Sequence, residues 1–188
     1  MAHTEPMEER NIAGNGAPLI PWDRTRKQFE EDASFDPTMR THWLATVRPD
    51  GRPHVMPVWA IWVAGAFYFT TGATTRKGKN LAHNPHCVIT VARSAPSGLD
   101  LIVEGKAMKV SDEAKMHQIA EVCASLGWHT TVRDGAFSAD SGAPSAGLFP
   151  FDIHEVQPAT VFGMNGGATR WSFSSAVTEN GRSSTEVL

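Results

Sequence analysis

The chain has 188 residues, of which 41% are hydrophobic and 20% are charged, with a formal net charge of −3. This size and balance are typical of one soluble globular domain with a real core. The slight negative charge argues against nucleic acid or an anionic membrane as the main partner. The sequence contains no run of about 18 apolar residues, so we expect no transmembrane helix. The N-terminal stretch MAHTEPMEERNIAGNG lacks the pattern of a signal peptide.

The first half of the chain predicts a helix and then strands. Residues 1–21 are rich in glycine, proline and charge, and we expect a mobile lead-in. Residues 22–32 predict a short polar helix anchored by Trp22 and Phe29. From residue 41 the apolar residues alternate as in strands, and the Asp50-Gly51 pair predicts a hairpin turn.

The run HVMPVWAIWV, residues 54–63, is nearly all apolar. Such a run predicts a strand that is buried on both faces or lies along a partner interface. Pro57 interrupts it, and proline cannot donate a hydrogen bond to a strand ladder. We therefore expect a bulge, a sheet edge or backbone diverted towards a ligand at this point.

The second half predicts further strands around one amphipathic helix. The strands are expected in AGAFYFTTG and in residues 86–93, 99–110, 151–164 and 168–173. The helix is capped by Ser111 or Asp112 and ends at Gly127.

Residues 128–149 predict a long lid-like loop, and residues 174–188 a polar tail. Residues 22–173 would form a single domain, mainly β with α+β character, in which short strands close into a small barrel.

The cysteines and histidines give little sign of a metal or redox site. Cys87 and Cys123 form no C-x-x-C pair, and we favour reduced thiols in a cytoplasmic protein over one disulfide. His83 and His86 have the spacing of a metal pair, but no third ligand stands nearby. We therefore expect no metal site.

The segment TTGATTRKGKN, residues 70–80, places Arg76, Lys77 and Lys79 in the first turn of a predicted helix. Each cation there opposes the helix dipole at a cost of up to about 1 kcal/mol. A bound anion removes the conflict, because charge-assisted hydrogen bonds to phosphate contribute about 1.5–3 kcal/mol each. The alternative is a solvated charged turn. We favour a phosphate-bearing ligand.

Three of the six tryptophans, Trp59, Trp62 and Trp171, are the candidates to line a pocket. An aromatic wall beside a phosphate anchor suggests a flat, phosphorylated cofactor. Nucleophilic catalysis has little support, because the sequence has no G-x-S-x-G. The stretch GNGAPL is not a Rossmann fingerprint.

Two stretches resemble a known family. GRPHVMPVWAIWVAGAFYFTTGATTRKGKNLAHNPHCVIT, residues 51–90, resembles the signature region of the pyridoxamine 5'-phosphate oxidase-like split-barrel flavoproteins. ATRWSF, residues 168–173, looks like the C-terminal TRW-x-F of the deazaflavin-dependent branch. The resemblance covers residues 38–173 and implies a split β-barrel homodimer. Coenzyme F420, or FMN as the alternative, would lie between the protomers.

The resemblance implies a role for each matching position. Arg76 and Lys77 would bind the cofactor phosphate, supported by the residues around them. Residues 56–59 would run along the ring, and Arg170 and Trp171 would close the site from the neighbouring subunit. No catalytic side chain is identified. The full set of implied cofactor-binding residues is Met56, Pro57, Val58, Trp59, Thr70, Thr71, Thr75, Arg76, Lys77, Gly78, Asn80, Arg170 and Trp171.

The implied activity is hydride transfer from reduced F420 to a small organic substrate of the ene, imine or quinone type. An FMN-binding oxidoreductase and a non-catalytic F420-binding protein are the alternatives. The chain lacks the C-terminal Arg-x-Glu arrangement of the oxidase members, so pyridoxamine phosphate oxidation is not expected. The loop at 128–149 has a composition of its own, so the family implies no particular substrate.

Overall fold

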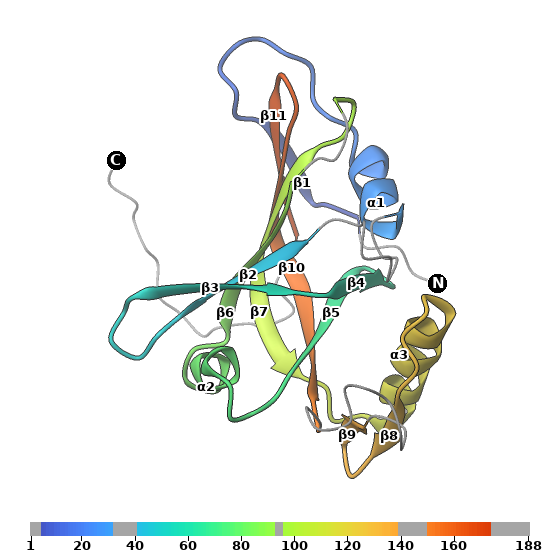
Figure 1. Ribbon diagram of the computed structural model, residues 1–188. Helices are drawn as coiled ribbons and strands as arrows, with labels where there is room; N and C mark the ends of the chain where they lie inside the picture. Colours follow the sequence, from blue (N-terminus) through green and yellow to red (C-terminus); the bar gives the residue numbers. More distant parts are fainter. Residues whose placement is uncertain (1–4, 32–40, 93–95, 139–149, 174–188) are drawn as a thin grey trace.

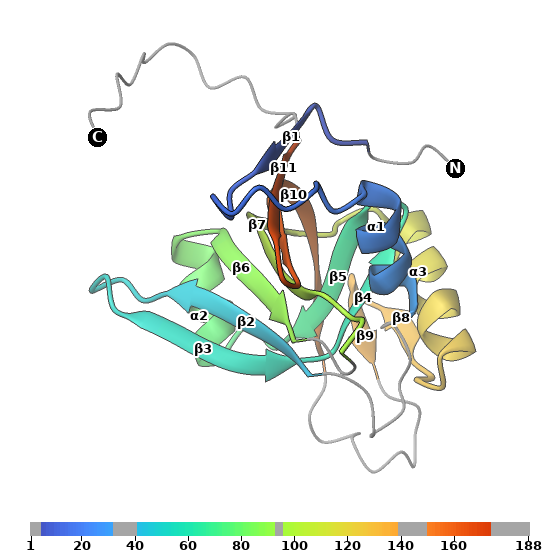
Figure 2. The same ribbon diagram turned by 90° about the horizontal axis from the view of Figure 1, so that it is seen from above.

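The structure is a computed structural model that describes residues 5–31, 41–92, 96–138 and 150–173 (Figure 1). The strands are β1 (Glu8–Asn11), β2 (His42–Val47), β3 (Pro53–Val58), β4 (Ala60–Val63), β5 (Ala66–Thr71), β6 (His86–Val91), β7 (Asp100–Lys109), β8 (Thr131–Arg133), β9 (Ala136–Ser138), β10 (Asp152–Met164) and β11 (Ala168–Ser172). The helices are α1 (Trp22–Glu31), α2 (Arg76–His83) and α3 (Glu113–Ser125). Helices α1 and α2 pack into the barrel core through Trp22, Phe29 and Leu81, whereas α3 packs on the opposite face of β4 and β5. In both views α2 stands apart from α1 and α3 (Figures 1 and 2).

The long strand β10 organises an antiparallel sheet in the order β1-β11-β10-β7-β6-β2-β3. One edge of β10 pairs with β7 along most of its length. The first half of β10 pairs with β5 and the second half with β11, so these two strands share its other edge. The register shifts after Pro158, where the proline has no amide to donate. The sheet divides at this point, as in the predicted split barrel.

The two faces of the sheet differ in burial. One ladder row of directly paired residues is buried and forms the barrel core: Leu44, Ile89, Val103, Val161 and Trp171. The next row points to the opposite face, because successive side chains of a strand alternate. That outer row is more exposed: Trp43, Thr90, Ile102, Phe162 and Arg170.

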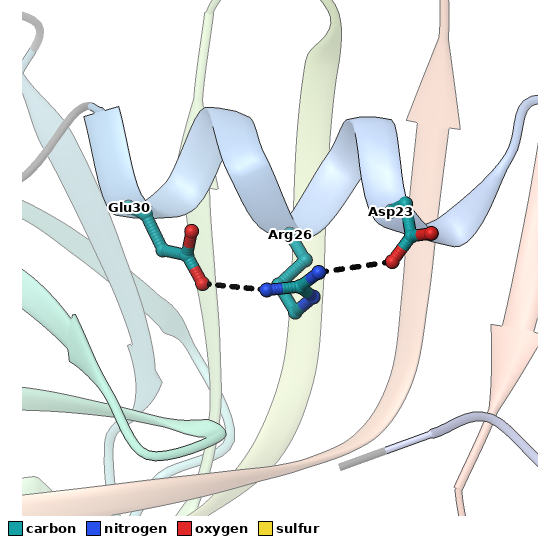
Figure 3. Close-up of polar contacts among 3 residues, drawn as sticks. All are labelled: Asp23, Arg26 and Glu30. Atoms are coloured by element: carbon teal, nitrogen blue, oxygen red, sulfur yellow. Dashed lines mark hydrogen bonds and ion pairs between the residues drawn. The ribbon is translucent and has the colours of Figure 1, made fainter. Parts of the chain in front are cut away.

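Helix α1 closes the barrel with its two predicted anchors, and both are buried. The Phe29 ring lies 4.9 Å from the ring of Trp62, and Trp22 lies 5.6 Å from Trp171. On the polar side of α1, Arg26 forms ion pairs with Asp23 at 3.0 Å and Glu30 at 2.9 Å (Figure 3). The prediction of a short polar helix here is confirmed.

In the first half, one sequence expectation was wrong, and one of the two alternatives for another was excluded. Residues 8–11, expected to belong to a mobile lead-in, form β1 and pair with β11. Their polar side chains suit an outer edge strand, which carries no hydrophobic pattern. The run 54–63 is not one strand buried on both faces, whereas its placement along a partner interface stays a prediction. It divides into β4, which is mostly buried, and β3, whose residues are exposed or half-buried because it is an edge strand. An edge is one of the places that Pro57 indicated.

Helix α3 begins at the predicted cap, where Asp112 accepts a hydrogen bond from the Lys115 amide. A hairpin of β8 and β9 follows, so residues 131–138 are not the loop that we expected. The turn Asp134-Gly135 explains the hairpin, since both residues have positive φ angles. Residues 139–149 and the tail at 174–188 lie outside the described residues. None of the described helices is long and apolar enough to cross a membrane.

Candidate functional site

The hydroxyl of Thr75 fixes the start of α2. It accepts a hydrogen bond from the Gly78 amide at 3.1 Å and donates one to the Gly72 carbonyl at 2.8 Å. The Thr71 hydroxyl lies 2.8 Å away and therefore donates to Thr75. These three bonds saturate the Thr75 hydroxyl. Thr71, Thr75 and Gly78 therefore build the helix start, and Thr75 has no hydroxyl proton left for a ligand.

Gly78 lets the loop before α2 pack directly against the helix. A Cβ atom at this position would lie 2.5 Å from the Gly72 carbonyl oxygen, which is closer than real contacts allow. Within the described chain, the amides of Arg76 and Lys77 have no hydrogen-bond partner. Such amides at the start of a helix form a natural anion site.

A buried contact holds α2 against the sheet. The Asn80 amide donates to the Thr46 hydroxyl on β2 at 2.9 Å. Thr46 is paired directly with His54 on β3, so both side chains share the face that α2 covers. Lys77 precedes Asn80 by three residues and therefore lies on the same side of the helix, towards these strands.

Positive charge accumulates here, although the carboxylate of Asp50 in the neighbouring turn acts on Arg48. Among the described residues, no acidic side chain forms an ion pair with Arg48, Arg76 or Lys77. Burial lowers the pKa of Lys77. Burial, followed by the charges of Arg48, Arg76 and Lys77, lowers the pKa of His54. We call Arg48, His54, Arg76 and Lys77 the cationic cluster.

The sequence did not single out two members of this cluster, Arg48 and His54. The Nε of Arg48 and the Nδ1 of His54 are buried, and neither has a hydrogen-bond partner in the described part of the chain. Strand alternation from Thr46 was the available signal, since it places Arg48 on the same face. That signal becomes informative only once α2 is known to cover this face.

An apolar edge continues from the cluster along β3. Met56 is 41% exposed, and Val58 is half-buried; both share the face of His54. Pro57 points to the opposite face, where it pairs with Trp43. Among the described strands, β3 pairs with β2 alone, so its other edge keeps free backbone donors and acceptors.

Beyond β3, Trp59 and Thr70 come together at a small cavity of about 10 Å³. The Trp59 ring lies 5.1 Å from the Trp128 ring, in an edge-to-face arrangement. The cavity holds one water molecule at most. Ile119 and Cys123 of α3 also line this cavity, which is too small for a substrate.

The structure separates Arg170 and Trp171 from the cationic cluster. Trp171 is completely buried in the barrel core, and its indole N–H donates to Glu9. We therefore do not retain Trp171 as a cofactor-binding residue. Arg170 lies on the outer face and forms an ion pair with Glu8 at 3.8 Å. Strand β11 and helix α2 stand far apart in Figure 1, so one chain does not bring Arg170 to this site.

Comparisons with known structures agree on the fold. A NimC/NimA family protein from Clostridium acetobutylicum is 17% identical, over 79% of this chain and 93% of that one, with a TM-score of 0.54. A putative pyridoxamine 5'-phosphate oxidase from Listeria innocua is 16% identical, over 76% and 99%, with a TM-score of 0.53. A heme-binding protein from Mycobacterium smegmatis is 18% identical, over 77% and 57%, with a TM-score of 0.52.

At these identities, the similar structures establish the fold alone. The comparison with curated proteins gives no match. The sequence pattern of the family described as pyridoxamine 5'-phosphate oxidase matches residues 30–165, which include the cationic cluster and the apolar edge. The chain therefore belongs to the pyridoxamine 5'-phosphate oxidase family.

Proposed function

We propose that the protein binds coenzyme F420 and transfers a hydride from its reduced form to a small organic substrate of the ene, imine or quinone type. One observation carries this proposal: the charges of Arg48, Arg76 and Lys77, which form no ion pair among the described residues, adjoin the apolar edge of Met56 and Val58. A planar coenzyme with a phosphate on its side chain has matching chemistry at both ends. The resemblance of residues 168–173 favours the deazaflavin over FMN.

The cationic cluster suits a phosphate energetically. Each charge-assisted hydrogen bond to phosphate contributes about 1.5–3 kcal/mol. The free amides of Arg76 and Lys77 add donors whose dipoles favour negative charge. Without an anion, the half-buried ammonium of Lys77 is desolvated and unpaired, which is unfavourable. A bound phosphate offsets this cost.

The coenzyme, when bound, supplies the hydride, and the chain supplies binding and orientation. Arg76 and Lys77 hold the phosphate, while Met56 and Val58 contact the apolar part of the ring and exclude water from it. The free edge of β3 offers backbone hydrogen bonds to polar ring atoms. Thr70 lies near the end of β5, just before the loop that leads to α2.

A homodimer would complete the site. Trp43 is 46% exposed and Val55 is 51% exposed, on an outer face that also carries Ile102 and Phe162. Exposed apolar rows of this kind mark protein interfaces. Arg170 lies in the same row. In a dimer packed on this face, Arg170 of each copy would therefore face the other copy.

FMN remains the alternative ligand because the cationic cluster recognises a phosphate, which both coenzymes carry. A binding protein without turnover is the second alternative. Fluorescence titrations with F420 and, separately, with FMN distinguish the ligands. We expect micromolar or tighter binding of F420 and weaker binding of FMN. Mixing the reduced F420 complex with a quinone should then oxidise the coenzyme faster than the free solution reaction. A preference for FMN, or no acceleration, would contradict the proposal.

A further inference from the structure

We propose that His54 is an additional ligand of the bound phosphate and binds it as the imidazolium, so that coenzyme binding takes up a proton. This inference rests on the proposed function for the identity of the ligand. It goes beyond that function in assigning His54 a role and in coupling binding to pH.

The position of His54 follows from the strand register. His54 is paired with Thr46, and Thr46 receives the hydrogen bond of Asn80 from α2. The Thr46 hydroxyl in turn donates to the His54 carbonyl at 3.3 Å, which fixes the backbone of β3 at this residue. The imidazole therefore stands on the face that α2 covers, and Lys77 faces it from the helix.

The imidazole has unused hydrogen-bonding capacity. Its Nδ1 is buried and has no partner among the described residues. A buried polar atom without a partner is costly, and most such atoms in proteins find one. The Nε of Arg48, on the same face, is likewise buried and unpartnered. Both side chains as a whole are only half-buried, so a change of rotamer would bring either group to a phosphate oxygen, which would accept the hydrogen bond.

The charges around His54 set its protonation in the free protein. Arg48 faces it from the end of β2, and Arg76 and Lys77 face it from α2; all three disfavour a further positive charge. The acid of the nearby hairpin turn, Asp50, is engaged by Arg52 at 2.7 Å. Burial acts in the same direction as the cations and lowers the pKa of His54. The free protein therefore holds a neutral imidazole at neutral pH.

A bound phosphate reverses the local field. Its negative charge becomes the nearest charge to His54 and favours the imidazolium, as bound ions commonly invert the protonation of their neighbours. The affinity for the phosphate must then rise as the pH falls, because proton binding and ligand binding are linked. Arginine and lysine side chains stay charged across this range, so histidine is the group that responds.

The test is isothermal titration calorimetry at pH 6 and pH 8 on full-length protein, with F420, FMN and inorganic pyrophosphate as probes. Two buffers of different ionisation enthalpy report the protons taken up. Lowering the pH from 8 to 6 should strengthen binding by wild type. This gain in affinity should be about tenfold larger than the gain shown by His54→Gln with the same ligand. Comparing proteins with one ligand cancels the titration of the ligand itself. His54→Arg should bind tightly at both pH values and take up no more protons than His54→Gln does with the same ligand. His117→Gln, an exposed histidine on α3, should behave as wild type.

The outcomes separate this inference from the proposed function. Coenzyme binding with equal pH dependence in wild type and His54→Gln would overturn the role of His54 and leave the proposed function intact. Proton-linked binding of pyrophosphate without binding of either coenzyme would support the role of His54 and overturn the proposed function. Binding of none of the three probes would overturn both.

Discussion

The side-chain amide of Asn80 donates a hydrogen bond of 2.9 Å to the hydroxyl of Thr46, and both residues are buried. This contact joins α2 to β2 and thereby sets the position of Lys77 relative to His54. A hydrogen bond in the core thus positions the charged surface that we assign to phosphate binding. The stability of the barrel and the geometry of the site are connected through these two residues.

Replacing Asn80 by alanine should lower the free energy of unfolding by about 1–3 kcal/mol, since it removes this bond and leaves the Thr46 hydroxyl with one partner fewer. Thr46→Val removes the same bond from the other side. In urea unfolding, the double variant should lose less stability than the sum of the two single changes. Additive losses would show that the contact does not couple α2 to β2.

Gly78→Ala should destabilise the protein, although alanine is normally about 1 kcal/mol more favourable than glycine in a helix. The new Cβ would lie 2.5 Å from the Gly72 carbonyl oxygen, and backbone cannot move aside cheaply. We expect a loss of about 1–3 kcal/mol by thermal unfolding, typical of overpacking. Lys79→Ala, at an exposed position of the same helix, should stay within about 0.5 kcal/mol of wild type. A more stable Gly78→Ala variant would contradict the close packing described.

Because His154 is buried, we expect the free energy of unfolding to depend on pH. His154 lies on β10, stacked on Phe69 with ring centroids 5.3 Å apart, and burial lowers its pKa. The unfolded chain, with an ordinary histidine pKa of about 6.5, therefore binds a proton at a higher pH than the folded protein does. Stability should fall as the pH is lowered from 7 to 5, because protons then favour the unfolded state.

His154→Phe should lose less stability than wild type over this pH range, measured by urea unfolding at each pH. Above about pH 7.5 the difference between the two proteins should no longer change with pH. His117→Gln is the matched control, since His117 is exposed and should leave the wild-type pH profile unchanged. Parallel profiles for wild type and His154→Phe would show that His154 does not titrate differently on folding.

Trp43 tests the proposed dimer. Wild-type protein should sediment at twice the chain mass of 20.4 kDa in analytical ultracentrifugation. Trp43→Glu should shift it to the monomer, because a charge buried in an apolar interface is costly. Leu19→Glu, at an exposed apolar residue outside the outer row, should remain dimeric. A monomeric wild type would contradict the proposal that a second copy completes the site.

Local signals predicted much of the fold. The Asp50-Gly51 hairpin and helix α3 with its Asp112 cap form where the sequence placed them, since turn residues and caps act over a few positions. Strand β1 was missed because an edge strand needs no hydrophobic face. The exposure of β3 was missed because a run of apolar residues does not reveal which edge of the sheet it occupies.

The site was predicted less completely. Arg76 and Lys77 conflict with the helix dipole, and that conflict is visible in the sequence. Arg48 and His54 join them only through the packing of α2 on β2, which no local pattern specifies. Strand alternation does place adjacent residues on opposite faces. It could therefore have shown that Arg170 and Trp171 do not act together on one ligand.

The central claim is that Arg76 and Lys77 bind the phosphate of the coenzyme. Its most direct test is a fluorescence titration of F420 with wild type, the Arg76→Ala/Lys77→Ala double variant and the control Lys79→Ala. We expect the double variant to lose at least about 100-fold in affinity, while its fold, followed by circular dichroism, is unchanged. The control should bind within about threefold of wild type, as expected for a solvated surface charge. A double variant that binds F420 as tightly as wild type would show that Arg76 and Lys77 do not bind the phosphate.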